Sequence, residues 1–159
     1  MSAIALLPRA PARDTALEEA LARYDANMAA YRVLCAKMRA PNRAALFEAL
    51  AAARISHVIV TLDPDDDDGR IEQLALIAHD RSTQLPLGPI ALSIPQWGLP
   101  DPIPLELSIP HAIERMACDC LEQAYGICEV DLSGPDKVAF NVAARSIVPV
   151  PRHGGKANA

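Results

Sequence analysis

The chain has 159 residues, of which 51% are hydrophobic and only 4% are aromatic, and its formal net charge is −5. A chain of this length can bury a core without a disulfide or a structural metal, so we expect one domain, with a helical appendage. No segment reaches the ~20 apolar residues that a membrane helix needs, and no signal peptide is recognisable. The four cysteines form no C-x-x-C pair. We therefore expect a soluble, cytoplasmic protein with reduced thiols.

Charge is distributed unevenly along the chain. Residues 1–55 carry eight Lys and Arg against five Asp and Glu, whereas residues 56–159 carry seven against fifteen. Both charged segments could be solvated surfaces without a specific partner. The alternative is a basic end and an acidic end that meet different partners.

Residues 13–55 are expected to form a helical hairpin, after a disordered segment at 1–12. Thr15 and Glu18 fit a capping box, which places a helix start nearby. Pro41 and Asn42 are expected to end this helix, and a second helix then runs to residue 55. The first helix carries apolar residues at strict heptad spacing, a set that we call the heptad face: Leu17, Leu21, Tyr24, Met28, Tyr31, Cys35 and Met38. This face packs inside the protein, or is open for a partner or for a homodimer.

Residues 56–151 are expected to form an α+β domain, followed by a disordered tail at 152–159. Val58, Val60 and Leu62 alternate with less apolar residues, which indicates a strand. Residues 70–78 fit helical spacing too, but their closeness to the first strand favours the second arm of a hairpin. Residues 96–106 are expected to be an extended loop. Further strands are expected at 90–94, 128–132, 138–142 and 147–150, with a helix at 108–125. The prediction is an antiparallel sheet of five to six short strands with one helix packed across it.

The aspartate run is the obvious candidate for a metal site, but its spacing is wrong for an EF-hand. If Gly69 takes the sixth position, Pro64 takes the first and Ala75 the twelfth, and neither has a side-chain oxygen. We therefore predict no metal site and no cofactor. The alternative function is a divalent-metal-dependent enzyme that uses the loop Asp63–Asp68, with His57 or His79.

No other catalytic pattern is present. The sequence has no G-x-S-x-G, no glycine-rich phosphate loop and no convergent Cys and His spacing, so we predict no catalytic residue. Its basic end lacks interleaved aromatic residues, so direct binding of nucleic acid is not expected. A non-enzymatic protein-binding module is the preferred interpretation.

Two groups of residues are the predicted binding sites. The acidic loop, Asp65, Asp66, Asp67 and Asp68 with Arg70 beside it, would meet a basic surface, such as that of a nucleic-acid-binding complex. Trp97 lies in a proline-rich loop, where it serves as an anchor against the core or as a binding hot spot. The alternative contact is the heptad face, which includes Tyr24 and Tyr31.

Several blocks of the sequence resemble a bacterial domain-of-unknown-function family found on plasmids and integrated mobile elements. NRAALFEALAAARISHVIVTLD resembles the family's NKAALFDALAAAGI and VTVTFDG, in the same order. SIPHAIERMACDCLEQAYG resembles LREAIETLAYDLLEETHG, and KVAFNVAARSIVPV resembles GEFTFDVAARSITLDFN. The resemblance covers about residues 41–150. No activity is established for that family, and the resemblance suggests an inhibitor of host defence or of another nucleic-acid machine.

The chain departs from that family in two loops. The family's polar signature GGWENNDGAYGE is replaced here by GICEVDLSGPDK, from Gly126 to Lys137. The family's GDSGQ turn, followed by IE, has become Asp66 to Arg70. The resemblance therefore implies a member that keeps the scaffold and has changed its loops.

Overall fold

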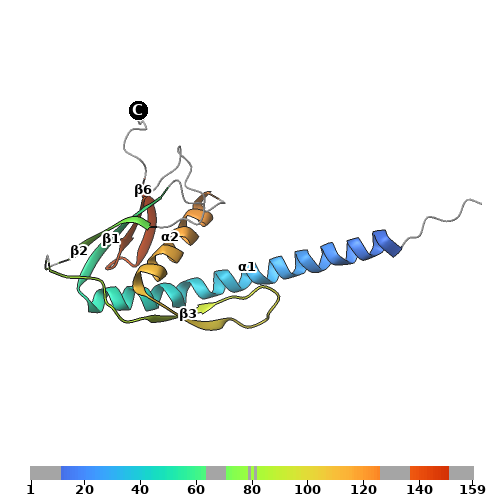
Figure 1. Cartoon of the computed structure of the whole chain (residues 1–159), viewed down its shortest axis with the longest axis horizontal. Coiled ribbons are helices and arrows are strands. Elements are labelled where there is room, and N and C mark those ends of the chain that lie inside the picture. Colours follow the sequence, from blue (N-terminus) through green and yellow to red (C-terminus); the bar gives the residue numbers. More distant parts are fainter. Residues whose placement is uncertain (1–11, 64–70, 79, 81, 126–136, 151–159) are drawn as a thin grey trace, which may run out of the picture. The chain divides into compact units, whose positions relative to one another are not determined.

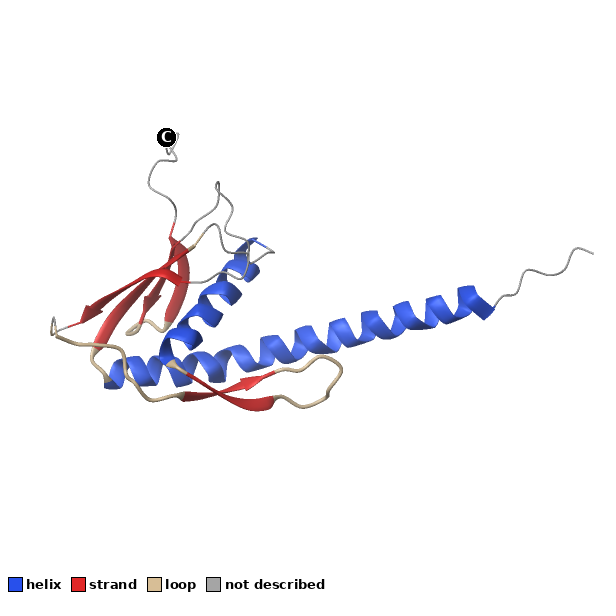
Figure 2. Cartoon of the chain, viewed as in Figure 1, coloured by secondary structure: helices blue, strands red, loops and turns tan. Residues whose placement is uncertain are grey.

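The computed structural model describes residues 12–63, 71–78, 80, 82–125 and 137–150. Within these residues there are two helices and six strands (Figures 1 and 2). The helices are α1 (Ala12–Ala52) and α2 (Ile109–Tyr125); the strands are β1 (Ile55–Leu62), β2 (Ile71–Ala78), β3 (Ile90–Ile94), β4 (Ile103–Leu107), β5 (Lys137–Asn141) and β6 (Ser146–Val150). The predicted α+β class is confirmed.

The chain divides into two compact units. The helical unit consists of Met1–Met38 and Ile94–Ile103, and the sheet unit consists of Arg39–Ser93 and Pro104–Ala159. Helix α1 supplies residues to both units.

The expected helical hairpin is wrong, because α1 is one continuous helix of 41 residues that contains Pro41. A proline in a helix interior costs about 3 kcal/mol relative to alanine. The turns that follow it bury Leu46, Phe47 and Leu50 almost completely, at 0%, 1% and 0% exposure. Full burial of one such side chain contributes about 1.5–3 kcal/mol, so their packing outweighs the cost of the proline. No described helix is long and apolar enough to cross a membrane.

Four strands of the sheet unit form an antiparallel sheet in the order β2-β1-β5-β6. β1 pairs with β2 as the predicted hairpin does, with Val58 opposite Leu76 and Val60 opposite Leu74. β5 pairs with β1 on its other side and with β6. The predicted strands at 138–142 and 147–150 are therefore confirmed, whereas the one at 128–132 lies outside the described residues.

One face of this sheet forms the core. Val58, Val60 and Leu62 are all fully buried, as their alternation predicted. Phe140 lies opposite Val58 in the register and is also fully buried. Helix α2 contacts β6 and buries an apolar stripe: Ile109, Ala112, Ile113, Met116, Ala117, Cys120 and Leu121. The expected helix across the sheet is thus present, and Ser108 caps it by accepting a hydrogen bond from the His111 N–H at 3.4 Å.

β3 and β4 form a separate two-stranded sheet. β3 has the predicted bounds, but β4 was expected to be loop because Pro104 lies within it. Neither strand of a two-stranded ribbon is central, and an edge strand tolerates a proline whose missing donor would face away from its neighbour. The Asn42 side chain fixes β3 through two hydrogen bonds, donating to the Ser93 carbonyl at 2.9 Å and accepting from the Ser93 N–H at 2.8 Å.

A half-exposed ion pair joins the two helices within the sheet unit. The Arg39 guanidinium donates to the two carboxylate oxygens of Asp119 at 3.2 and 3.4 Å. Gln123, one turn further along α2, also donates to this carboxylate at 2.7 Å. The pair links the part of α1 that belongs to the sheet unit to α2.

Candidate functional site

Three of the predicted binding residues come together in the helical unit as an aromatic cluster of Tyr24, Tyr31 and Trp97. The Trp97 ring lies 5.4 Å from the Tyr24 ring and 5.8 Å from the Tyr31 ring, measured between centroids, and both pairs are tilted. The two tyrosines stand seven residues apart on α1, so they share one face of the helix. Trp97 therefore bridges two turns of the helix.

A tight turn presents Trp97 to the helix. The Leu99 N–H donates to the Gln96 carbonyl at 3.2 Å, which closes a four-residue turn around Trp97 and Gly98. Gly98 has a φ of 76°, the left-handed conformation that glycine adopts without steric cost. A type II turn requires such a residue at its third position. Gly98 therefore allows the turn that places the Trp97 indole against α1.

The aromatic cluster stays accessible to solvent although its rings pack on one another. Tyr24 is 53% exposed and Trp97 is 44% exposed. Leu99, in the same loop, is 50% exposed. Rings fixed by mutual packing lose little further freedom when a partner covers them, and partly exposed Trp and Tyr are typical anchors of protein interfaces.

The other predicted binding residues cannot be placed. Asp65, Asp66, Asp67, Asp68 and Arg70 lie outside the described residues. Within the described residues, no three His, Cys, Asp or Glu side chains converge as a metal site would require. His57 lies 3.1 Å from the Ser56 hydroxyl, measured from Nδ1, and that hydroxyl donates to the Ile77 carbonyl at 2.9 Å. His79 lies outside the described residues.

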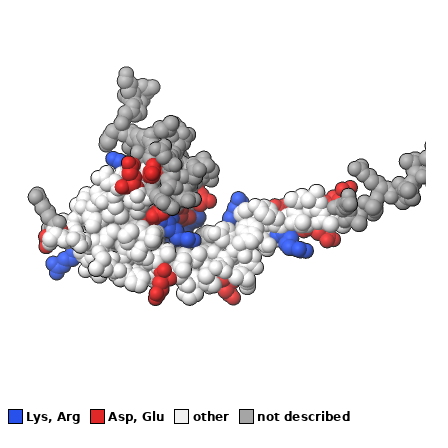
Figure 3. Space-filling view, in the orientation of Figure 1, with Lys and Arg blue, Asp and Glu red and all other residues white. Residues whose placement is uncertain are grey.

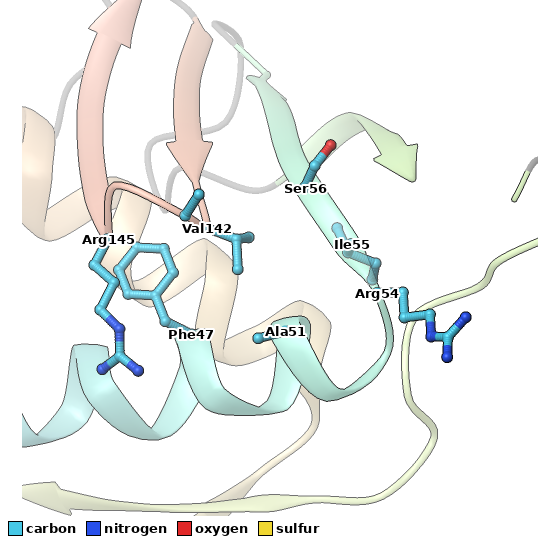
Figure 4. A pocket seen from close by; sticks show the side chains of 8 residues that line it. Phe47, Ala51, Arg54, Ile55, Ser56, Val142 and Arg145 are labelled. Carbon is cyan, nitrogen blue, oxygen red and sulfur yellow. The ribbon is translucent and has the colours of Figure 1, made fainter. Parts of the chain in front are cut away.

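The sheet unit contains an open pocket that the sequence did not reveal. It has a volume of about 530 Å³ and lies between the C-terminal end of α1 and the turn from β5 to β6, with Phe47 pointing into it (Figure 4). Arg54 and Arg145 line it, and both have left-handed backbones, with φ values of 59° and 52°. Their guanidinium groups point in different directions (Figure 4). The two side chains do not converge on one ligand position.

Among the described residues, two ionisable groups have shifted pKa values. Burial raises the pKa of the Cys120 thiol, Arg43 opposes this shift, and Asp119 adds to it. The thiol lies 3.6 Å from the Ile147 carbonyl and remains a protonated donor. Hydrogen bonds from the Ser82 backbone and side chain lower the pKa of the exposed Asp80 carboxyl. Cys35 and Cys120 are free thiols.

Sequence reasoning selected the aromatic residues but did not predict that they meet. Tyr24 and Tyr31 occupy equivalent positions of the heptad face, which was the available signal that one ring could bridge them. The loop that carries Trp97 has no periodic pattern of apolar residues. The position at which it packs on α1 could therefore not be predicted from the sequence.

Comparison with known proteins identifies one family. The model of a family of unknown function, DUF6878, matches residues 38–149. Tyr24 and Tyr31 precede the matched region, whereas Trp97 lies within it. No match was found among proteins of curated function or among solved structures.

Proposed function

We propose that this chain, which belongs to the DUF6878 family of unknown function, is a non-enzymatic protein-binding module. The sheet unit is its scaffold, and the aromatic cluster is its recognition surface. We further propose that it acts in the cytoplasm as a mobile-element accessory, by inhibiting a host defence complex or another nucleic-acid-processing complex.

The aromatic cluster is the observation that carries this proposal. It joins a loop of the family-matched region to a helical segment that precedes that region. The indole is held by two tyrosines and still exposes 44% of its surface. An apolar side chain of a partner that covered Trp97 would gain burial while meeting rings that are already ordered.

The acidic loop is proposed to act on the rate of association. Five of the six residues from 63 to 68 are aspartates, which attract a basic partner over about a Debye length of 8 Å at physiological salt. We expect Asp65–Asp68→Asn to slow association at low salt and to change little at high salt. Trp97→Ala, in contrast, is expected to speed dissociation.

A photo-crosslinking experiment tests the proposed surface. A photoreactive amino acid is placed at position 99 of a tagged chain in native host cells, because Leu99 is 50% exposed beside Trp97 and its replacement leaves the indole in place. In a control chain it is placed at Leu87, which is 98% exposed and lies outside the aromatic cluster. The expected result is one protein crosslinked from position 99 and not from position 87. With that protein purified, Trp97→Ala is expected to raise the dissociation rate constant about 30-fold or more, as for a hot spot of 2 kcal/mol or above.

Two results would overturn the proposal. The first is an identical crosslinking pattern from both positions, together with unchanged binding kinetics for Trp97→Ala. The second is turnover of a substrate by the purified protein in Mg²⁺ or Mn²⁺ that is lost on Asp66→Asn. That result would establish the metal-dependent enzyme in place of the binding module.

A further inference from the structure

The open pocket of the sheet unit has an apolar floor and a positively charged rim. Its volume of about 530 Å³ lies within the range of ligand sites, about 300–1,000 Å³. The apolar lining residues are Phe47, Ala51, Ile55, Val142 and Ala143, and the others are Arg54, Ser56 and Arg145. No described acidic residue lines the pocket. Its charge therefore favours an anionic ligand.

The backbones of the two arginines are unusual in the same way. In the part of the chain that the structure describes, only Arg54 and Arg145 have a positive φ without being glycine. Glycine adopts this left-handed conformation without steric cost, whereas a residue with a Cβ does not. Such strained positions cluster at functional sites and ligand clamps. Both of these positions line one pocket.

Local structure at each position calls for glycine rather than for arginine. Arg54 follows the end of α1, where a cation is also favoured by the helix dipole. Arg145 closes the turn between β5 and β6, and its N–H donates to the Val142 carbonyl at 3.3 Å. No helix ends at Arg145, so the dipole explains only one of the two arginines. The pocket is the feature that they share.

The two guanidinium groups are placed to bind two separate anionic groups. Both side chains are exposed, and neither is ion-paired within the described residues. Arg145 lies at the Phe47 end of the pocket and Arg54 at the opposite end (Figure 4). Phe47 and Arg54 are seven residues apart, and a helix rises about 1.5 Å per residue, so these ends lie roughly 10 Å apart. One phosphate or carboxylate cannot reach both.

An extended peptide fits this arrangement of charge and apolar surface. A strand advances about 3.3 Å per residue, and its first, third and fifth side chains point to the same side. Acidic side chains at the first and fifth positions are then roughly 13 Å apart at their backbones, and flexible side chains cover the difference. An apolar side chain at the third position lies over the floor. A nucleic acid supplies phosphates at such spacings but no apolar group for the floor.

We propose that this pocket docks an extended acidic peptide of a partner protein, with an apolar residue between two acidic ones. Arg145 binds one carboxylate and Arg54 binds the other. The apolar side chain covers Phe47 and Val142. This site belongs to the sheet unit and does not include the aromatic cluster, so it stands independently of the proposed function.

A titration of the ¹⁵N-labelled full chain, followed by NMR, tests the site with the peptide Glu-Ser-Val-Ser-Glu, capped at both ends. We expect saturable shifts of the amides of Arg54, Val142 and Arg145, and none of the Trp97 indole. An exposed ion pair contributes little, so replacing each Glu by Gln should weaken binding by up to about fivefold. Replacing Val by Ser should also weaken it, because the floor then stays uncovered.

Variants of the two arginines separate binding from folding. Arg54→Gly and Arg145→Gly place glycine where the backbone favours it, so neither should lower the melting temperature, but each should weaken peptide binding by up to about fivefold. Arg115→Ala is the matched control, since it removes an exposed arginine that does not line the pocket. It should leave the affinity unchanged.

Three results would overturn the proposal. They are the absence of saturable shifts at millimolar peptide, an unchanged affinity in the double variant Arg54→Gly/Arg145→Gly, and tighter binding of a single-stranded oligonucleotide at the same amides. The last result would indicate a nucleic-acid site. Trp97→Ala removes the recognition surface of the proposed function and should bind the peptide normally, so failure of that function and failure of this inference are distinguishable.

Discussion

The two units place similar apolar residues in opposite environments. Leu50 of the sheet unit is fully buried, whereas Leu21, on the same helix but in the helical unit, is 54% exposed. The side chains are identical and their helical propensity is the same. The comparison teaches that the sheet unit buries its leucines in a core, whereas the helical unit leaves apolar side chains exposed.

The same substitution at these two leucines is the strongest test of that contrast. Leu50→Ala removes a fully buried side chain and leaves a cavity, so we expect the free energy of unfolding to fall by about 2–5 kcal/mol. Leu21→Ala should cost less than about 0.5 kcal/mol in the monomer, because its side chain is already in water. Urea denaturation at low protein concentration measures both. Equal losses would refute the division of roles.

Removal of the Asn42 side chain should cause the next largest loss in the free energy of unfolding. Asn42→Ala leaves the Ser93 N–H and carbonyl without their partner, which we expect to cost about 1–3 kcal/mol. Asn42→Asp is the matched control, because it keeps an acceptor for the Ser93 N–H but loses the donor. Hydrogen exchange at the Ser93 amide should be faster in Asn42→Ala than in Asn42→Asp. The prediction fails if β3 exchanges equally in both.

A smaller effect, an increase in the free energy of unfolding, is expected from a substitution at the C-terminal end of α1. Arg54 has a φ of 59° and its N–H donates to the Ala51 carbonyl at 2.9 Å, a helix-terminating geometry that glycine usually provides. Arg54→Gly should therefore stabilise the protein by up to about 1 kcal/mol. Glu48→Gly, at an exposed position within the same helix, should destabilise it by about 0.5–1 kcal/mol. Thermal melting of the two variants gives the signs directly, and a lower melting temperature for Arg54→Gly would contradict the argument.

The two units can also be compared by the reactivity of their cysteine thiols, which requires no substitution. Cys35 of the helical unit is half-buried, whereas Cys120 of the sheet unit is buried and its thiol pKa is raised. The thiolate is the reactive form, so at mildly alkaline pH we expect Cys35 to be alkylated well before Cys120. Peptide mapping by mass spectrometry follows each site, and denaturant should equalise the rates. Equal rates in the native protein would mean that the sheet unit opens readily.

Local patterns in the sequence were sufficient to predict much of the secondary structure of the sheet unit. The alternation of Val58, Val60 and Leu62 predicted a strand and its buried face, because side chains of a strand point to alternate faces. Ser108 and the apolar stripe after it predicted α2 in the same way. The bounds of β3 followed from the prolines on either side. Each of these features depends on neighbours within a few residues.

Features that depend on distant residues were decided by the tertiary structure. Pro41 is a helix breaker on local grounds, and α1 continues through it because Leu46, Phe47 and Leu50 are buried and Asn42 bonds to Ser93. β4 exists because it pairs with β3, although it contains Pro104.

The aromatic cluster shows both contributions at once. The heptad spacing by itself determined that Tyr24 and Tyr31 share a face of α1. Only the tertiary structure decided that Trp97, 66 residues beyond Tyr31, lies against them. Closing so long a segment costs conformational entropy, which no local pattern specifies and which only the contacts made at its end can offset.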